Sequence, residues 1–252
     1  AQRLKYVDEY YFSKKMREVN SYISSGRPII NMAIGSPDLS PSLEVKQALS
    51  ESIDHQRSSM YQSYIGLPEL REAISNFYNK QYGVEINPQN EILPLMGSKE
   101  GIMHISMAFL NKRDGVLIPN PGYPTYGAVS KLLGAEIFYY SLSKENNWYP
   151  KMDDLNTLDT KNIKLMWINY PHMPTGADFS EKKLNELISW AYKNDIILIN
   201  DNPYSFILNK KPRSILSLKN SKGVTIELNS LSKSFNMAGW RVGMMVGESK
   251  FI

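Results

Sequence analysis

A lysine set among small hydroxyl residues is the strongest sign of chemistry in this sequence. Lys233 follows Ser230 and Ser232, and Arg241 comes eight residues after it in a Gly-Trp-Arg turn. A lysine amine can bind a carbonyl carbon covalently, and hydroxyl donors together with a cation can hold a phosphate dianion. The alternative is an ordinary solvated lysine, which most lysines are. The run is suited to a ligand with both a carbonyl and a phosphate, and other segments must supply its remaining partners.

A carboxylate and a phenol form a second candidate group. Asp201 closes an apolar run that predicts a strand at residues 196–201, and Tyr204 follows it three residues later. A carboxylate beside a ring nitrogen keeps that nitrogen protonated, which makes the ring an electron sink. The alternative is that Asp201 caps a turn or helix at the end of a strand.

A glycine turn offers a third candidate, an anion site. Gly97, Ser98 and Lys99 lie between the strand predicted at 92–96 and a helical segment that begins near residue 102. Free backbone N–H groups at a helix start attract phosphate. An ordinary helix cap is the alternative. A nucleotide fits less well, because the sequence holds no Walker motif and no G-x-G-x-x-G.

The elements that must position these residues follow an alternating pattern. The helix predicted from Pro68 has its apolar residues on one face, and another, predicted at 181–193, begins behind a Ser180 cap. Strands are predicted at 92–96, 116–119, 136–141, 165–169, 196–201 and 224–228. Strands alternating with helices predict an α/β fold with a mostly parallel sheet covered by helices, and ligands at the carboxyl ends of its strands.

Composition narrows the function classes. The 252 residues are 42% hydrophobic, and 29 basic and 25 acidic residues spread along the chain give a net charge of +4 without a basic block. Binding to nucleic acid is therefore not expected. The absence of cysteine removes disulfides and thiolate chemistry, and fits a cytoplasmic protein. Apolar runs are too short to span a bilayer, so no membrane association is expected. His172 has no second ligand at metal-site spacing, so no metal is expected either.

Taken together, these segments resemble the class I/II aminotransferases, the fold-type I pyridoxal-phosphate-dependent enzymes of the aspartate aminotransferase superfamily. The resemblance implies the cofactor pyridoxal 5′-phosphate, bound covalently by Lys233. It implies that Asp201 pairs with the pyridinium nitrogen and that Tyr204 donates to the phenolic oxygen O3′. The residues implied to hold the phosphate are Ser98, Lys99, Ser230, Ser232 and Arg241. For Arg241, a role in bridging core carboxylates is the alternative.

Two tyrosines gain roles from the resemblance alone. Tyr123, in the run Pro-Gly-Tyr-Pro-Thr-Tyr, matches the position that stacks an aromatic ring on the cofactor, whereas Tyr126 is expected to pack in the core. Tyr61 matches a tyrosine that reaches the phosphate of the neighbouring subunit, which implies a homodimer with shared sites. Its alternative is a surface aromatic near a turn. Residues 34–38 are similar to the family's N-terminal substrate loop.

One position departs from the family pattern. Met173 stands where the family's Asn-Pro-Thr-Gly signature has an asparagine that donates to O3′, and a thioether cannot donate. Either Tyr204 donates alone, or a group such as His172 substitutes, or the protein belongs to a subgroup with altered chemistry.

The expected activity is a ping-pong transfer of an amino group between an α-amino acid and a 2-oxo acid. Lys233, Asp201 and Tyr204 are the expected catalytic residues. Two alternatives share the cofactor contacts: a lyase that eliminates a β-substituent such as a thiol, and a non-catalytic domain that binds the cofactor. The expected organisation is an arm with part of a small domain at residues 1–45 and a large cofactor domain at 46–252. The family's C-terminal small-domain region is absent, so the chain is expected to be part of a longer protein.

Overall fold

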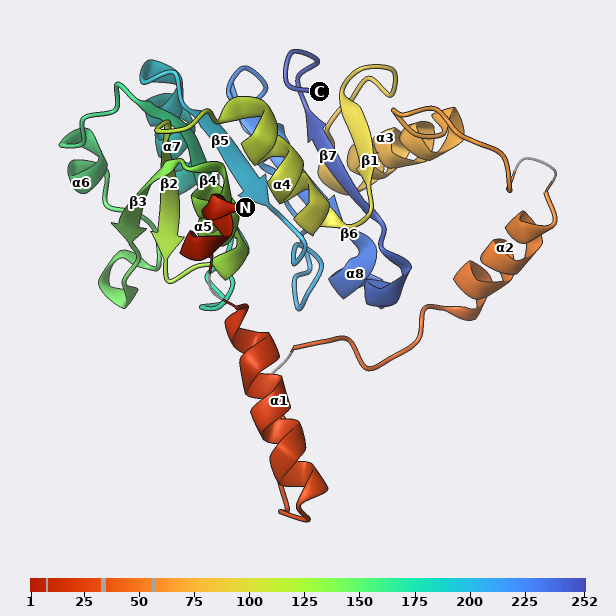
Figure 1. Ribbon diagram of the computed structural model, residues 1–252. Helices are drawn as coiled ribbons and strands as arrows, with labels where there is room; N and C mark the ends of the chain where they lie inside the picture. The colour runs from red at the N-terminus through yellow and green to blue at the C-terminus, as the bar shows by residue number, and fades with distance from the viewer. Residues whose placement is uncertain (8, 33–34, 56–57) are drawn as a thin grey trace.

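A mixed β-sheet forms the centre of the molecule (Figure 1). The computed structural model describes residues 1–7, 9–32, 35–55 and 58–252. Within them the sheet has seven strands in the order β1-β7-β6-β5-β4-β2-β3. Their bounds are β1 Ile92–Leu95, β2 Gly115–Asn120, β3 Glu136–Ser141, β4 Ile163–Ile168, β5 Ile197–Asp201, β6 Thr225–Ser230 and β7 Gly243–Gly247. Strands β2 to β6 pair in parallel, whereas β7 runs antiparallel to both β6 and β1.

The predicted α/β fold with a mostly parallel sheet is confirmed, and each of the six predicted strands is present with ends shifted by at most two residues. Strand β7 was missed. It follows the Gly-Trp-Arg turn and enters the sheet between β1 and β6, so the chain adds one antiparallel strand to an otherwise parallel order.

Helices cover both faces of the sheet. Their bounds are α1 Tyr11–Ser24, α2 Leu43–Ile53, α3 Pro68–Tyr82, α4 Ser98–Phe109, α5 Pro124–Leu133, α6 Met152–Asn156, α7 Glu181–Lys193 and α8 Leu231–Ser234; 3-10 turns occupy Gln2–Tyr6, Lys144–Asn146, Ile215–Ser217 and Ala238–Trp240. As predicted, α3 starts at Pro68, and the Ser180 hydroxyl caps α7 by accepting from the backbone N–H of Lys183. Gly83 ends α3 with a positive φ of 66°, a conformation that glycine adopts without steric cost.

The sheet separates two apolar cores. Alternate strand residues point to opposite faces, so Trp167 packs with α4 and α5 on one side while Met166 packs with α3, α6 and α7 on the other. Strand β4 is a nearly continuous apolar run, as is typical of a parallel strand covered on both faces, whereas β6 is equally buried but includes polar residues such as Glu227 and Asn229.

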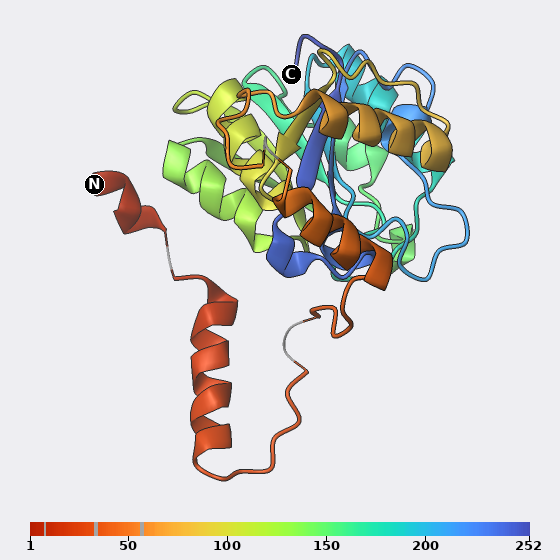
Figure 2. The ribbon, with the colours of Figure 1, turned by 90° about the vertical axis from the view of Figure 1, so that its right-hand side faces the viewer.

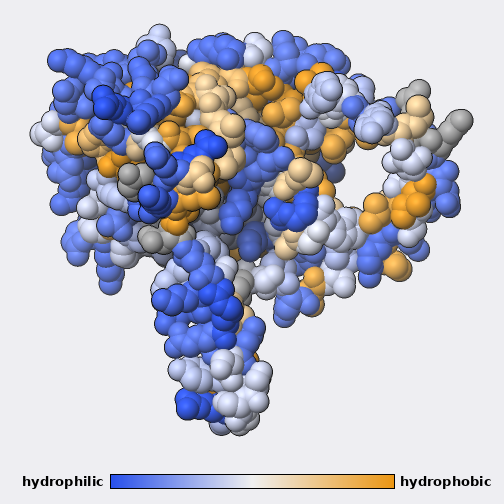
Figure 3. All heavy atoms as spheres, viewed as in Figure 1, coloured by the Kyte–Doolittle hydropathy of each residue, from blue (hydrophilic) through white to orange (hydrophobic). Residues whose placement is uncertain are grey.

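The N-terminal segment extends away from this body. Two perpendicular views show α1 projecting from the sheet (Figures 1 and 2). Helix α2 lies apart from α1, at the side of the sheet. Arg71 is the first buried residue among those described, so the core begins at α3. Apolar side chains gather on α2, while much of α1 is polar (Figure 3). The domain boundary at residues 45 and 46 stays a prediction.

Candidate functional site

The candidate residues converge at the carboxyl ends of neighbouring strands. Asp201 ends β5 and Ser230 ends β6, and these two strands are hydrogen-bonded partners. The Gly97 turn follows β1, which runs in the same direction as β6 because β7 between them is antiparallel to both. Parallel topology thus brings together side chains that lie far apart in the sequence.

Asp201 is a buried carboxylate with an open side. Its Oδ2 accepts a hydrogen bond from the Tyr126 hydroxyl at 2.9 Å, whereas Oδ1 is buried and has no partner among the described residues. Burial raises the pKa of Asp201 to about 6, against the lowering effect of the Tyr126 hydrogen bond. Burying a carboxylate oxygen without a hydrogen bond costs free energy, and a donor that carries positive charge would remove this cost. Oδ1 is therefore well suited to such a donor.

Tyr126 has a role beyond the packing expected from the sequence. Its ring is fully buried and stacks on Trp167, with ring centroids 4.8 Å apart. Its hydroxyl holds one oxygen of Asp201 and therefore sets the direction in which the other oxygen points. The position of Tyr126 in the first turn of α5, directly after β2, was the signal that could have identified it.

The Gly97 turn, Arg241 and β7 are in close contact. Gly97 has a φ of 87°, and a Cβ added there would lie 2.1 Å from Nη2 of Arg241. Arg241 donates to the carbonyl oxygens of Ala238 and Met96, not to core carboxylates, in the part of the chain that the structure describes. Its guanidinium therefore lies against the N-terminus of α4, where Ser98 and Lys99 begin the helix. A helix N-terminus with an adjacent cation is suited to a phosphate.

Ser230 and Ser232 join this group from β6 and α8. Both are buried, the Ser230 hydroxyl lies 2.9 Å from that of Ser232, and it also caps α8. Lys233 follows on the same short helix, and its ammonium donates to the backbone oxygen of Gly35 at 3.1 Å. Partial burial lowers the pKa of Lys233, which favours the neutral amine that can attack a carbonyl. Of the predicted substrate loop, Ile34 lies outside the described residues.

Two further phenols, those of Tyr10 and Tyr123, lie near Tyr204. Burial raises the pKa of Tyr204 to about 12, with smaller contributions from Asp201, Tyr123 and Tyr10. The Lys99 ammonium lies 4.9 Å from the ring centroid of Tyr10 and 5.8 Å from that of Tyr123. Sequence reasoning missed Tyr10, since it treated the N-terminal residues as an arm. The structure brings Tyr10 to the same place as the predicted residues Tyr123 and Tyr204.

Met173 and Tyr204 line one pocket of about 330 Å³. The Met173 backbone N–H donates to Asn169 at 2.7 Å, which fixes the loop. His172 is buried beside it, with Nδ1 2.8 Å from the Thr175 hydroxyl, and burial lowers its pKa to about 4. Nδ1 of the neutral imidazole is thus paired within its own loop, whereas Nε2 is buried and has no hydrogen-bond partner among the described residues. That His172 replaces the missing asparagine donor therefore stays an alternative.

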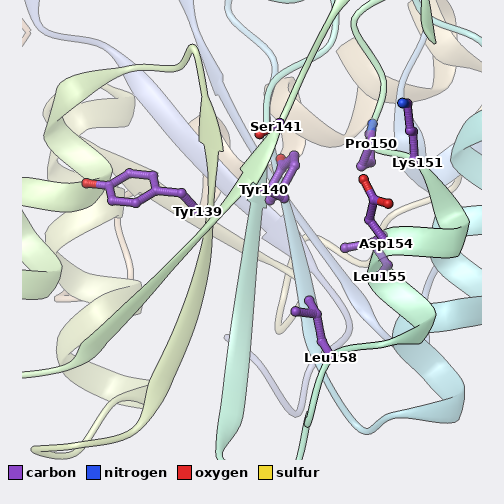
Figure 4. Close-up of a pocket in the computed structure, with 8 residues that line it drawn as sticks. All are labelled: Tyr139, Tyr140, Ser141, Pro150, Lys151, Asp154, Leu155 and Leu158. Atoms are coloured by element: carbon purple, nitrogen blue, oxygen red, sulfur yellow. The ribbon is translucent and has the colours of Figure 1, made fainter.

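Other features lie apart from this group. A smaller pocket of about 140 Å³ between β3 and α6 shares no residue with it (Figure 4). Tyr61 is fully exposed. The residues described contain no cluster of carboxylates and histidines that could hold a metal ion, and none of their helices is long and apolar enough to cross a membrane.

The residues present fit pyridoxal phosphate. The unpartnered Oδ1 of Asp201 suits a protonated ring nitrogen, and the Gly97 turn with Arg241 suits the phosphate. Lys233 supplies an amine whose pKa is lowered. These three groups match the ring nitrogen, the phosphate and the aldehyde of that cofactor.

Comparison with known proteins gives independent evidence on the family. Residues 27–252 match the family of class I and II aminotransferases. The chain is 39% identical over its whole length to the LL-diaminopimelate aminotransferase of Dehalococcoides mccartyi, and 36% identical over 99% of its length to that of Aquifex aeolicus. It spans 66% and 65% of those proteins, so it covers less than two thirds of their length.

Comparison with solved structures gives the same fold as in known aminotransferases. The chain superimposes on apo-BacF from Bacillus subtilis with a TM-score of 0.94 at 34% identity, covering all of this chain and 64% of that one. A Thermus thermophilus aspartate aminotransferase with maleate gives a TM-score of 0.92 at 23% identity, which supports the fold. With nine tenths of its residues inside the family match and the buried site at the expected strand ends, the chain belongs to the class I and II aminotransferases.

Proposed function

We propose that this chain is the cofactor-binding part of a pyridoxal-phosphate-dependent aminotransferase. The family to which it belongs depends on that cofactor. The observation that carries the proposal is the buried carboxylate of Asp201, which ends β5 with one oxygen unpartnered. The substrates are an α-amino acid and a 2-oxo acid. Because its relatives are named LL-diaminopimelate aminotransferases, we infer an amino donor of that class.

Each residue has a defined task in this proposal. When bound, the cofactor supplies an electron sink for the electrons left on the substrate's α-carbon. Asp201 keeps the ring nitrogen protonated through Oδ1, while Tyr126 holds the carboxylate in place. The Lys233 amine would hold the aldehyde carbon of the cofactor, and as a free amine it would carry the proton of the substrate's α-carbon.

The remaining residues bind and orient. Tyr204 donates to the phenolic oxygen, Met173 contributes only apolar contact, and Tyr123 stacks on the ring. The phosphate contacts are assigned to Ser98, Lys99, Ser230, Ser232 and Arg241. Tyr10 adds a phenol beside Lys99 and Tyr123.

Transfer is favoured over the two alternatives because the named relatives are aminotransferases. A homodimer with shared sites is part of the proposal, supported by exposed aromatic side chains at Tyr61 and Tyr64. A cytoplasmic location stays a prediction that is based on composition.

Covalent capture tests the proposal. Purified full-length protein incubated with pyridoxal phosphate should absorb visible light, and borohydride should fix the cofactor on Lys233, as peptide mapping can show. The matched variants are Lys233→Ala, which should lose the adduct, and the exposed Lys222→Ala, which should keep it. A folded protein that carries the adduct on another lysine, or carries none, would contradict the assignment. Incubation with LL-diaminopimelate should give bound pyridoxamine phosphate. A lyase would instead release ammonia, a thiol and an oxo acid continuously from an amino acid that carries a thiol substituent on its β-carbon, which LL-diaminopimelate lacks.

A further inference from the structure

A buried polar network lies on the opposite face of the sheet from Asp201. Glu227, in the middle of β6, is completely buried, and helix α3 packs over it through Tyr78 and Tyr82. These two tyrosines are one helical turn apart, with ring centroids 5.1 Å from each other. Neither the cofactor contacts nor the proposed chemistry uses any of these groups.

Glu227 receives hydrogen bonds from three segments of the chain. The Tyr78 hydroxyl donates from α3 at 3.0 Å, and Asn200 donates from β5 at 3.3 Å. From the loop after Tyr204, the Ser214 hydroxyl and the Ile215 N–H donate at 2.9 and 3.0 Å. Several donors directed at one carboxylate stabilise its ionised form, although burial raises the pKa of Glu227 to about 6. The carboxylate therefore holds the far end of the loop that carries Tyr204.

Tyr82 holds the near end of the same loop. Its hydroxyl lies 2.7 Å from that of Ser205, the residue next to Tyr204, and accepts a hydrogen bond from Asn229 at 3.0 Å. The side-chain oxygen of Asn229 in turn accepts from the backbone N–H of Ser230 at 2.8 Å. One phenol on α3 thus connects the segment of Tyr204 with the strand end of Ser230.

We propose that Tyr82 is a positioning residue that fixes Tyr204 and Ser230 relative to each other through Ser205 and Asn229. The inference rests on the proposed function, because Tyr204 and Ser230 are its assigned contacts to the phenolic oxygen and the phosphate of the cofactor. Tyr82 acts from behind the sheet and touches neither. Removing its hydroxyl takes one hydrogen-bond partner from the Ser205 hydroxyl and one from the Asn229 amide, and it breaks the connection between the two segments.

The test compares two buried tyrosines in the full-length protein. Tyr82→Phe removes the connecting hydroxyl. Tyr140→Phe is the matched control, since the buried Tyr140 hydroxyl bonds to the Trp167 carbonyl outside this network. Dissociation of pyridoxal phosphate is measured by absorbance titration at a temperature where circular dichroism shows both variants folded. Tyr82→Phe should weaken binding roughly tenfold, as loss of a buried hydrogen bond predicts, and Tyr140→Phe should leave binding within about twofold of wild type.

A double-mutant cycle separates positioning from general destabilisation. In a Tyr204→Phe background, Tyr82→Phe should weaken binding less than it does alone, because one of the two groups that it positions has already lost its donor, while Ser230 still depends on it. Ser205→Ala removes the other end of the same hydrogen bond and should reproduce the coupling. Equal effects of the Tyr82 and Tyr140 changes, or full additivity with Tyr204→Phe, would overturn the inference. Failure of the wild-type protein to bind the cofactor would instead overturn the proposed function.

Discussion

Burial of Asp201 makes the protein without cofactor less stable above neutral pH. Its pKa is raised to about 6 in the folded state, whereas the ordinary value is 3.8. The folded state therefore holds a proton that the unfolded state has already lost between these values. The contribution to stability is fully present below about pH 4 and is lost as the pH rises through about 6. The proposed function uses the charged form of Asp201, whereas the free energy of folding without cofactor favours the protonated form.

Asp201→Asn is expected to stabilise the protein when no cofactor is bound. The neutral amide removes the need to ionise a buried group, so the free energy of unfolding at pH 8 should rise by about 3 kcal/mol, and the gain should shrink toward zero near pH 4. Urea unfolding across this range measures it. The exposed Asp153→Asn is the control and should leave the profile unchanged. A gain that does not depend on pH would show that Asp201 is not the titrating group.

At this scale, sequence reasoning recognises residues whose types are unusual for their position. Lys233 among serines and Asp201 at the end of an apolar strand are such cases, and the structure places both at neighbouring strand ends. Tyr126, Tyr82 and Glu227 were not identified. A tyrosine on a helix reads as core packing, and the partner of its hydroxyl is set by tertiary contacts that no local pattern contains.

Strand β7 packs closely against the Gly97 turn at a glycine. A Cβ added at Gly243 would lie 2.6 Å from the Ser98 backbone nitrogen and 2.7 Å from the Gly97 carbonyl carbon. Both contacts are with backbone atoms, which cannot rotate away as side-chain ends can. The bare backbone at Gly243 therefore lets the N-terminus of α4 approach β7 closely, as the Gly97 turn requires.

Gly243→Ala should weaken both fold and phosphate binding. The methyl group forces β7 and the α4 N-terminus apart, at a cost of about 1–3 kcal/mol in the free energy of unfolding. Pyridoxal phosphate should lose more affinity than pyridoxal, which lacks the phosphate. Gly239→Ala adds the same methyl group into open space and serves as the control. Equal loss for the two ligands would mean that Gly243 does not shape the phosphate turn.

Elements with strong periodicity or clear caps were predictable, and β7 was not. The α3 and α7 helices have proline or serine at their starts and apolar residues on one face. By contrast, β7 is a short run, Gly-Met-Met-Val-Gly, whose two ends are glycines and whose composition suits a loop. Its place in the sheet depends on pairing with β1 and β6, which are distant in the sequence.

On the scale of the whole molecule, the first seventy residues contact the core sparingly. The described residues of α1 and α2 include none that is buried, and α2 exposes Leu43, Leu49 and Ile53. Tyr61 and Tyr64 are fully exposed shortly after it. Exposed apolar and aromatic residues that are close in sequence typically mark a surface for another protein. A second copy of the chain is the partner that the shared-site proposal requires.

Hybrid dimers test that requirement. If Tyr61 of one subunit serves the cofactor of the other, a dimer of a Tyr61→Phe subunit with a Lys233→Ala subunit contains one site with both native groups. The site of the first subunit keeps its own Lys233 and receives the native Tyr61 from its partner, whereas the other site lacks both. Random exchange of equal amounts should thus restore about a quarter of the wild-type activity. Lys233→Ala alone should be inactive, and Tyr61→Phe alone should show a raised dissociation constant for pyridoxal phosphate.

The control mixture joins Lys233→Ala with Tyr11→Phe, an exposed tyrosine of α1. The activity of this mixture should fall in proportion to the fraction of sites that keep Lys233, and the activity for each such site should not rise. If the Tyr61 mixture also shows no gain above simple dilution after subunit exchange, or if sedimentation finds an active monomer, each subunit completes its own site.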